Sequence, residues 1–244
     1  MLRKGCYVAR FAQSDADVIA AQRLRHLCFV TGAGRGALPD GLDRDGFDES
    51  CMHVLIEDAG GRLLACFRLL FLESAIRIGN SYAAQYYDLT ALQSFPGAVA
   101  EMGRFCMHPD LRDPDVLRVA WGAVTRCVDQ AGVGLLFGCS SFAGTDAAPY
   151  ADSFGQLHAC HLAPARWSPG TKAPDVVHFS AALHDRRRAL QKMPPLLRAY
   201  LGMGGWVSDH AVVDRTMNTL HVFTGVEIAA IPTARARALR AVAG

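Results

Sequence analysis

The chain has 244 residues, of which 51% are hydrophobic and 20% are charged, and its formal net charge is +2. This composition is typical of a folded protein and excludes a disordered, collagen-like or coiled-coil chain. The net charge is too small to predict nucleic-acid binding. No segment approaches the roughly 18 uncharged apolar residues that span a bilayer, and the N-terminus does not resemble a secretory signal.

Eight cysteines are scattered along the chain without any C-x-x-C pair. Reduced core cysteines in a cytoplasmic protein are therefore expected, and no metal site is predicted from these spacings. A chain of this length can bury one large core. We expect residues 1–244 to form a single domain, in which residues from about 176 onward complete the sheet and end in a basic tail.

In the first half of the chain, alternating and helical patterns of apolar residues predict well-separated elements. They are a strand at 5–12, a helix capped by Ser14 and Asp17 that runs to about 29, a long loop at 31–50, and strands at 52–58 and 62–71. The glycine-rich turn between the last two strands is typical of a hairpin.

The second half has a strand, a helix and a strand at its centre. The helix is predicted to begin at Pro114, with Asp113 as its cap, and to end at Gly132. Further elements are a strand at 134–141, a helix around 146–160, a strand-like segment at 175–183, a short helix at 194–204, and strands at 206–214 and 219–228. The whole pattern predicts a mixed α/β sheet.

The stretch VAEMGRFCMHP (99–109) looks like a buried strand, yet it contains Glu101 and Arg104. Strand side chains alternate between faces, so residues three apart should point to opposite sides. Gly103 between them indicates a β-bulge, which would bring both charges to one face. Because bulges are frequent beside active sites, this strand is the first candidate for a catalytic element.

Three weaker motifs have simpler interpretations. The acidic loop LDRDGFDES (42–50) loses the ligand register of an EF-hand, so a solvated turn competes with calcium binding. GCSSF (138–142) lacks the second glycine of a nucleophile elbow. His158 and His161 have no third ligand at a suitable spacing, which favours ordinary histidines.

Arg25 and Arg68 lie in apolar segments, and with Glu101, Arg104, Asp45 and Asp48 they form a set of opposite charges. Charges in a core are costly unless they are paired or used in function. The set is therefore more informative than any one member.

The order of these residues resembles that of the acyl-homoserine-lactone synthases, which belong to the GNAT superfamily and take acyl chains from acyl carrier protein. The motifs are L-R-x-x-x-F (Leu24, Arg25, Phe29), D-x-x-D (Asp45, Asp48), F-R-L-L (67–70) and E-x-x-R-F (Glu101, Arg104, Phe105). The remaining chain is more similar to bacterial ornithine-lipid N-acyltransferases. That likeness is carried by AQRLRHLCF, EMGRFCMHPDLR, LFGCSSFAGTD, MPPLLRAYLGMGG and AVVDRTMNTLHVF, over about residues 6–224.

This resemblance implies a GNAT-like acyl-CoA N-acyltransferase fold with a C-terminal extension. It also implies transfer of a 3-hydroxyacyl chain from acyl carrier protein to the α-amine of ornithine, which gives a lyso-ornithine lipid. Two features depart from the pattern. The acetyl-CoA loop R/Q-x-x-G-x-G/A is replaced by LRDPDVLR (111–118), which puts CoA use in doubt, and Met217 and His221 differ from the C-terminal pattern.

The chemistry needs a base for the amine, charge partners for ornithine and donors for the oxyanion. We expect Glu101 to be the general base and Arg104 to orient it or the substrate. The expected substrate-binding residues are Asp45, Asp48, Arg68, Arg25 and Phe29. The expected contacts to the acyl donor and its pantetheine are Phe105, Met107, Arg112, Arg118, Cys139 and Ser140. No bound cofactor and no metal are expected; the acyl chain arrives as a carrier-protein thioester.

Basic segments suggest where partners bind. Arg186-Arg187-Arg188 is suited either to an acidic carrier protein or to a solvated helix face. The C-terminal ARARALRAVAG could lie on anionic lipid at the inner face of the membrane. The alternatives for function are an acyl-homoserine-lactone or other N-acyl amino acid synthase, a CoA-dependent acetyltransferase, and a non-catalytic binding module on the same fold.

Overall fold

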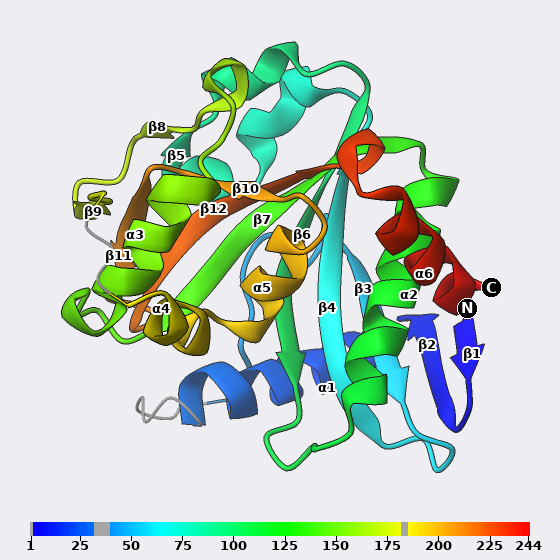
Figure 1. Cartoon of the computed structure of the whole chain (residues 1–244). Helices are drawn as coiled ribbons and strands as arrows, with labels where there is room; N and C mark the ends of the chain where they lie inside the picture. The colour runs from blue at the N-terminus through cyan, green and yellow to red at the C-terminus, as the bar shows by residue number, and fades with distance from the viewer. Residues whose placement is uncertain (1, 32–39, 182–184) are drawn as a thin grey trace. The chain divides into compact units, whose positions relative to one another are not determined.

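The computed structural model describes residues 2–31, 40–181 and 185–244 (Figure 1). Its contacts divide the chain into two compact units. The first unit comprises Met1–Phe71, Met102–Gly132 and Thr233–Gly244, and the second comprises Leu72–Glu101 and Val133–Pro232. Strand β6 (Ala98–Met107) contributes its first residues to the second unit and its last residues to the first.

The first unit contains an antiparallel sheet with three helices. The strands are β1 (Leu2–Lys4), β2 (Tyr7–Phe11), β3 (Met52–Glu57) and β4 (Leu63–Leu72), followed in the sheet order by β6. The helices are α1 (Asp15–His26), α2 (Pro114–Gln130) and α6 (Thr233–Ala243), and α6 packs alongside α2 (Figure 1). Gly122 permits this packing, because a Cβ there would lie 2.8 Å from side-chain atoms of Leu2 and Val242.

Capping residues fix the ends of these helices as the sequence predicts. The Ser14 side chain accepts a hydrogen bond from the Asp17 N–H at the start of α1. Asp113 accepts from the Asp115 N–H at the start of α2, where Pro114 is the first helical residue. Beyond the end of α2, Gly132 has a φ of 61°, a conformation that glycine adopts without steric cost.

The second unit contains a five-stranded arrangement in the order β6–β7–β12–β11–β9. The strands are β7 (Val133–Ala143), β12 (Thr219–Glu227), β11 (His210–Asp214) and β9 (Val176–His178); β10 (Trp206–Val207) also pairs with β12. Strands β6 and β7 are parallel, and the other pairs in this unit are antiparallel. A parallel pair needs a long crossover, and α2 lies within that connection.

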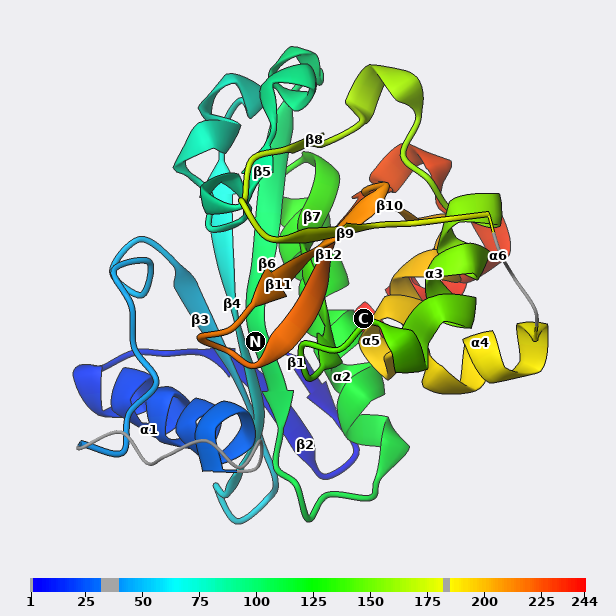
Figure 2. The same ribbon diagram turned by 90° about the vertical axis from the view of Figure 1, so that its left-hand side faces the viewer.

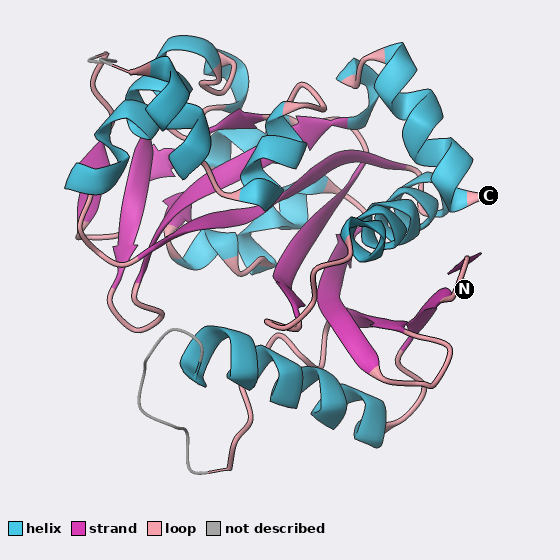
Figure 3. Ribbon diagram, turned by 60° about the horizontal axis from the view of Figure 1, so that its bottom comes forward, coloured by secondary structure: helices cyan, strands magenta, loops and turns pink. Residues whose placement is uncertain are grey.

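Shorter elements complete the second unit (Figure 3). Its helices are α3 (Ala151–Cys160), α4 (Arg186–Lys192) and α5 (Pro195–Leu201), and β5 (Tyr87–Asp88) pairs with β8 (Gly170–Thr171). The segment before β6 forms 3₁₀ turns η2 (Ala75–Asn80), η3 (Ala83–Gln85) and η4 (Thr90–Ser94). Three more turns are η5 (Ala148–Tyr150), η6 (Ala165–Trp167) and η7 (Ile228–Ala230).

Most predicted elements are confirmed, and the differences have local causes. Strand β1 was missed because it has only three residues. The helix predicted to 29 leaves α geometry after His26 and continues as a π-helical turn, η1 (Leu27–Thr31). The strand predicted at 206–214 is two strands, because residues 208–209 break it. Parts of the predicted loop at 31–50 and of the strand-like segment at 175–183 lie outside the described residues.

Gly225 on β12 makes room for the indole ring of Trp206, its cross-strand partner on β10. A Cβ at this position would lie 2.5 Å from Trp206, so Gly225→Ala must displace that ring. We expect the substitution to lower the free energy of unfolding by about 1–3 kcal/mol, as overpacking generally does. Gly79→Ala is the matched control in the same unit, because nothing lies within 4 Å of its Cβ position. Urea unfolding of both variants measures the difference, and equal stabilities would contradict the packing argument.

Candidate active site

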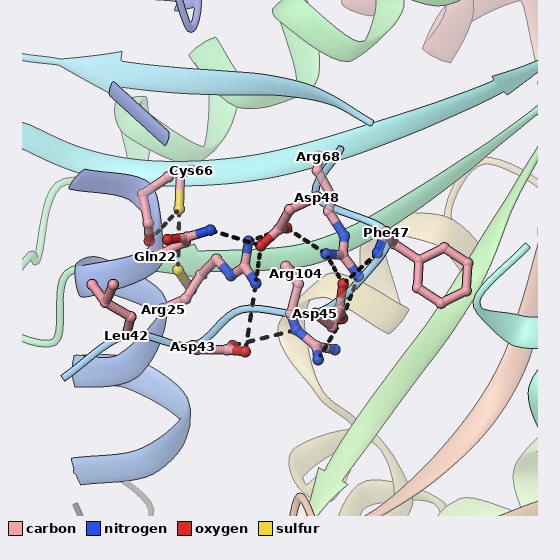
Figure 4. A network of polar contacts seen from close by, with 12 residues as sticks. Gln22, Arg25, Leu42, Asp43, Asp45, Phe47, Asp48, Cys66, Arg68 and Arg104 are labelled. Atoms are coloured by element: carbon pink, nitrogen blue, oxygen red, sulfur yellow. Dashed lines mark hydrogen bonds and ion pairs between the residues drawn. The ribbon is translucent and has the colours of Figure 1, made fainter. Parts of the chain in front are cut away.

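Six charged residues of the first unit meet in one network, which we call the Arg–Asp cluster (Figure 4). Its members are Arg25, Asp43, Asp45, Asp48, Arg68 and Arg104. Arg25 comes from α1, Arg68 from β4 and Arg104 from β6. The three aspartates come from the loop before β3, so the cluster attaches this loop to a helix and two strands.

Asp48 is at the centre of the network. Its carboxylate accepts hydrogen bonds from Arg25 Nη1 at 2.7 Å, Arg68 Nη1 at 2.6 Å and Gln22 Nε2 at 2.9 Å. Such charge-assisted bonds are roughly twice as strong as neutral ones. Asp48 therefore couples helix α1 to strand β4.

Asp45 and Asp43 extend the network to Arg104. Arg68 binds both carboxylate oxygens of Asp45, at 2.6 and 2.8 Å, and Arg104 Nη2 approaches Asp45 at 3.1 Å. Asp43 lies 3.5 Å from Arg25 Nη2 and 3.3 Å from Arg104 Nε. Three guanidinium groups thus face three carboxylates, and their formal charges cancel.

Burial differs across the cluster. The side chains of Arg25 and Arg68 are 1% and 4% exposed, whereas those of Arg104 and Asp45 are 13% and 22% exposed. Buried charges are tolerated only when their partners and hydrogen bonds compensate for lost hydration. Arg25 and Arg68 therefore have a structural task, and the Asp45–Arg104 side of the cluster is the part more open to solvent.

The electrostatics of Asp48 give a pH dependence of stability. Burial alone would raise its pKa, but hydrogen bonds and charge from Arg25 and then Arg68 outweigh burial and lower the pKa to about 2. Because the folded-state pKa lies below the unfolded value of about 3.9, the ionised form stabilises the fold above pH 4. This contribution, about 2–3 kcal/mol, is lost as the pH falls from 4 through 2.

We therefore expect the free energy of unfolding to fall between pH 4 and pH 2, with a shallower slope in Asp48→Asn than in the wild type. Asp175→Asn is the control, since Asp175 is exposed and pairs only at the surface with Arg215. Denaturant titrations at several pH values measure these slopes. Identical slopes in wild type and Asp48→Asn would contradict the assigned role.

Strand β6 departs from regular strand geometry at Arg104, whose φ is 52°. A positive φ in a residue other than glycine is uncommon and costs energy. Arg104 directly follows Gly103, where the sequence predicts a β-bulge. This left-handed conformation occurs at the residue whose guanidinium binds Asp43 and Asp45.

Glu101 lies in the second unit and is buried. Its two carboxylate oxygens accept hydrogen bonds from the backbone N–H groups of Tyr82 and Ala83, both at 2.7 Å. These two N–H groups lie at the start of the 3₁₀ turn η3, where helical N–H groups lack partners along the chain. Glu101 therefore holds this turn against β6, and the two N–H groups hold the Glu101 carboxylate in a fixed position.

The residues predicted to contact the acyl donor lie in both units. In the first unit, the Phe105 ring stacks on Phe67, and the Met107 carbonyl accepts from the Cys28 thiol. Arg112 and Arg118 are exposed near the start of α2, where Arg118 pairs with Asp115.

In the second unit, Ser140 is buried on β7 and its hydroxyl accepts from Thr224. Cys139, its neighbour, is half-buried. Phe29, predicted to bind substrate, is half-buried in the first unit and packs against a small core that includes Leu24 and Leu55.

The sequence did not indicate several groups that contact the Arg–Asp cluster or Glu101. Asp43 belongs to the same acidic loop as Asp45, and Gln22 lies three residues before Arg25 on α1. The sequence positions of both residues could therefore have indicated that they join the Arg–Asp cluster. Nothing in the sequence indicated the backbone N–H groups of Tyr82 and Ala83 as partners of Glu101, because the segment before β6 shows no periodicity.

His221 is buried next to Tyr87, whose hydroxyl donates to the His221 carbonyl at 2.7 Å. Burial lowers the pKa of the His221 imidazole to about 4.

Strands β6 and β7 are parallel, helix α2 lies in the connection between them, and β6 carries both Glu101 and Arg104. Residues 24–122 match the family model described as acetyltransferase (GNAT) domain. Among solved structures, FeeM, an N-acyl amino acid synthase from uncultured soil microbes, aligns with a TM-score of 0.55 at 12% identity, over 91% of this chain and 92% of FeeM. The predicted fold class is confirmed.

Sequence relatives identify the family. The L-ornithine N(alpha)-acyltransferase of Rhodobacter capsulatus is 38% identical over 229 residues, which cover 88% of each chain. That of Brucella abortus is 30% identical over 238 residues, covering 91% of this chain and 84% of the relative. This chain belongs to the L-ornithine N(alpha)-acyltransferase family, which confirms the resemblance seen in the sequence.

As an acyltransferase of this kind, the protein uses an acyl thioester as its donor. Across residues 2–31, 40–181 and 185–244, no helix has both the length and the apolar character needed to cross a membrane.

Proposed function

We propose that the protein transfers a 3-hydroxyacyl chain from acyl carrier protein to the α-amine of ornithine, the first step of ornithine-lipid synthesis. An amide bond forms between the α-nitrogen and the acyl carbon, the carbon–sulfur bond breaks, and the carrier thiol leaves with a proton. The observation that carries this proposal is the 38% identity to a curated L-ornithine N(alpha)-acyltransferase over 88% of both chains. Because the alignment spans 229 residues, we also propose that the whole chain serves one acyltransferase activity.

We assign the general base to Glu101. Ornithine is protonated at its α-amine, so the nitrogen must lose a proton before or during attack on the thioester. The proposed acceptor of this proton is the Glu101 carboxylate, directly or through a relaying water. Two backbone N–H groups hold this carboxylate in place, as a catalytic base requires.

Within the first unit, we assign contact with the amino acid to Asp45 and Arg104, the more exposed members of the Arg–Asp cluster. A carboxylate suits an ammonium group, and a guanidinium suits a carboxylate. Asp48, Arg68 and Arg25 then act by positioning these two residues through the hydrogen bonds described above. Phe29 supplies an apolar wall.

On the donor side, we assign the pantetheine phosphate to Arg112 and Arg118. The first N–H groups of α2 are a less suitable site, because the Asp113 carboxylate already accepts from one of them and carries negative charge. Phe105, Met107, Cys139 and Ser140 complete the proposed set of donor contacts. Residues 82–95 are the proposed lining of the acyl tunnel.

Exposed basic residues are the proposed contacts with macromolecules. Arg186, Arg187 and Arg188 are exposed on α4 and suit an acidic carrier protein. On α6, Leu239 and Ala243 are buried and Arg240 pairs with Asp129 at 2.8 Å. Any contact of α6 with anionic lipid at the inner membrane surface is therefore electrostatic, through its exposed Arg235 and Arg237, since its apolar side is already packed.

Incubation of the purified protein with 3-hydroxyacyl carrier protein and a panel of amino acids tests the proposed function. Mass spectrometry is expected to detect N-acylornithine, with carrier protein preferred over CoA as donor. Consumption of another amine while ornithine is ignored would overturn the acceptor. Turnover of acetyl-CoA without carrier protein would favour a CoA-dependent acetyltransferase, and no turnover with any amine would favour a binding module.

A further inference from the structure

Strands β9 and β11 pair at the edge of the sheet in the second unit (Figures 1 and 2). Three potential metal-binding side chains meet there. His178 ends β9 and His210 begins β11, and the two residues are direct partners in the antiparallel register. Directly opposed residues of an antiparallel pair share one face of the sheet. Asp209 adjoins His210 in the chain and brings a carboxylate to the same place.

The distances between these groups suit a shared ligand. His178, Asp209 and His210 each offer one ligand atom, and the three atoms all lie within 4.8 Å of one another. Asp209 Oδ1 is 2.7 Å from His210 Nδ1, and the two imidazole rings are 5.5 Å apart. Around a tetrahedral ion with bonds of about 2.0–2.2 Å, ligand atoms are separated by roughly 3–3.5 Å, so small side-chain rotations would suffice.

One side of this group of three side chains is buried in the protein, and the other side is open to solvent. The His210 side chain is 0% exposed, and its Nδ1, which faces Asp209 Oδ1, is the nitrogen that an ion shared with this carboxylate would contact. Tyr87 packs against this ring, 5.2 Å between centroids, and fixes its plane. Asp209 and His178 are exposed, so an ion can enter from solvent and keep a water molecule.

Hydrogen bonding within the fold does not account for this arrangement. The Asp209–His210 bond explains the positions of two of the three residues, but it does not explain why the exposed His178 imidazole lies beside them. An ion bound by two imidazoles and a carboxylate would give all three side chains a common partner.

We propose that His178, Asp209 and His210 form a binding site for a divalent transition-metal ion, with zinc as the best match. Two imidazoles and one carboxylate are a donor set that Zn²⁺ accepts, whereas Mg²⁺ and Ca²⁺ prefer oxygen ligands alone. The ion would join β9, an edge strand of three residues, to β11. His178, Asp209 and His210 are not among the residues assigned to acyl transfer, although Tyr87, which packs against His210, lies in the proposed lining of the acyl tunnel. The role of the ion is to fix this edge of the sheet.

The sequence predicted no metal site because His178 is 31 positions before Asp209, a spacing that matches no zinc motif. Only the pairing of β9 with β11 brings the residues together.

The test uses the full-length protein without an affinity tag, stripped with a chelator and titrated with Zn²⁺ by calorimetry. We expect one equivalent to bind and to raise the melting temperature. His178→Ala and Asp209→Asn are expected to weaken binding by more than about 100-fold, since loss of an outer-sphere partner alone typically costs 10–100-fold. Both side chains are exposed, so folding should survive, and circular dichroism of the stripped variants checks this.

His158→Ala, in the same unit, is the matched control and should bind zinc as the wild type does. Co²⁺ substitution adds an independent readout, because a low-symmetry site of this kind gives visible absorption bands that both variants should lose. The proposal is overturned if zinc binding is absent, if it is equally strong in His178→Ala, or if it is lost in His158→Ala instead. None of these outcomes bears on acyl transfer, which is assayed separately.

Discussion

Glu101→Gln is expected to lower the rate of acyl transfer by about 10²–10⁴-fold, the usual contribution of a positioned general base. The amide is nearly isosteric with the carboxylate, but it cannot accept the proton that the α-ammonium group must lose before or during attack of the amine. The decrease should appear mainly in kcat. The difference in rate between the variant and the wild type should become smaller as the pH rises, because more ornithine is then already deprotonated. Steady-state assays with 3-hydroxyacyl carrier protein and ornithine from pH 6.5 to 9.5 measure both effects.

The pH dependence of the rate distinguishes a catalytic role of Glu101 from a structural role. Glu101 also holds the N–H groups of Tyr82 and Ala83, so the amide weakens that turn whatever the chemistry. A purely structural role would give a loss that is independent of pH. Glu73→Gln, an exposed glutamate of the same unit, is the control and should retain the wild-type rate. Wild-type turnover in a folded Glu101→Gln protein would remove Glu101 from the mechanism.

Arg25→Met is expected to lower the free energy of unfolding by about 3–5 kcal/mol, which is the usual cost of removing one partner from a buried ion pair. The substitution leaves Asp48 and Asp43 buried with fewer compensating donors, although methionine fills much of the volume. Because native proteins are stable by only about 5–15 kcal/mol, such a loss could unfold a large fraction of the protein. Urea denaturation followed by circular dichroism measures the change.

Arg240→Met is the matched control in the same unit. Its ion pair with Asp129 is solvent-exposed, so the expected cost is about 0–1 kcal/mol. The double variant Arg25→Met/Asp48→Asn should be less destabilised than the sum of its single variants, because the neutral amide no longer needs a cation. Equal stabilities of Arg25→Met and Arg240→Met would refute the importance of the buried pair.

The Arg–Asp cluster and Glu101 illustrate two ways to keep charge inside a protein. In the cluster, opposite charges cancel through side-chain contacts, which fix the acidic loop to α1, β4 and β6. The Glu101 carboxylate instead accepts hydrogen bonds from two backbone N–H groups. Both arrangements place an acid in a defined position before any substrate arrives, and this preorganisation is what acyl transfer to an amine requires.

Much of the architecture is determined by the sequence alone. Apolar periodicity located β3, β4, β7 and β12, and the cap at Asp113 with Pro114 located the start of α2. These features depend on interactions within a few residues, which is why a local pattern predicts them. The order of the arginine and acidic motifs resembles that of the acyl-homoserine-lactone synthases, and the remaining sequence motifs indicated the family.

Other features were decided by the tertiary structure. Three of these features bring together residues from separate elements: the hydrogen bonds of Glu101, the contacts of Asp43 in the Arg–Asp cluster, and the pairing of His178 with His210. A fourth is the left-handed backbone conformation of Arg104. These features depend on which strands pair and on packing between elements far apart in the sequence, and a local pattern of residue types does not specify either. The sequence therefore specified which charged residues must find partners, whereas only the folded chain decided which partners they found.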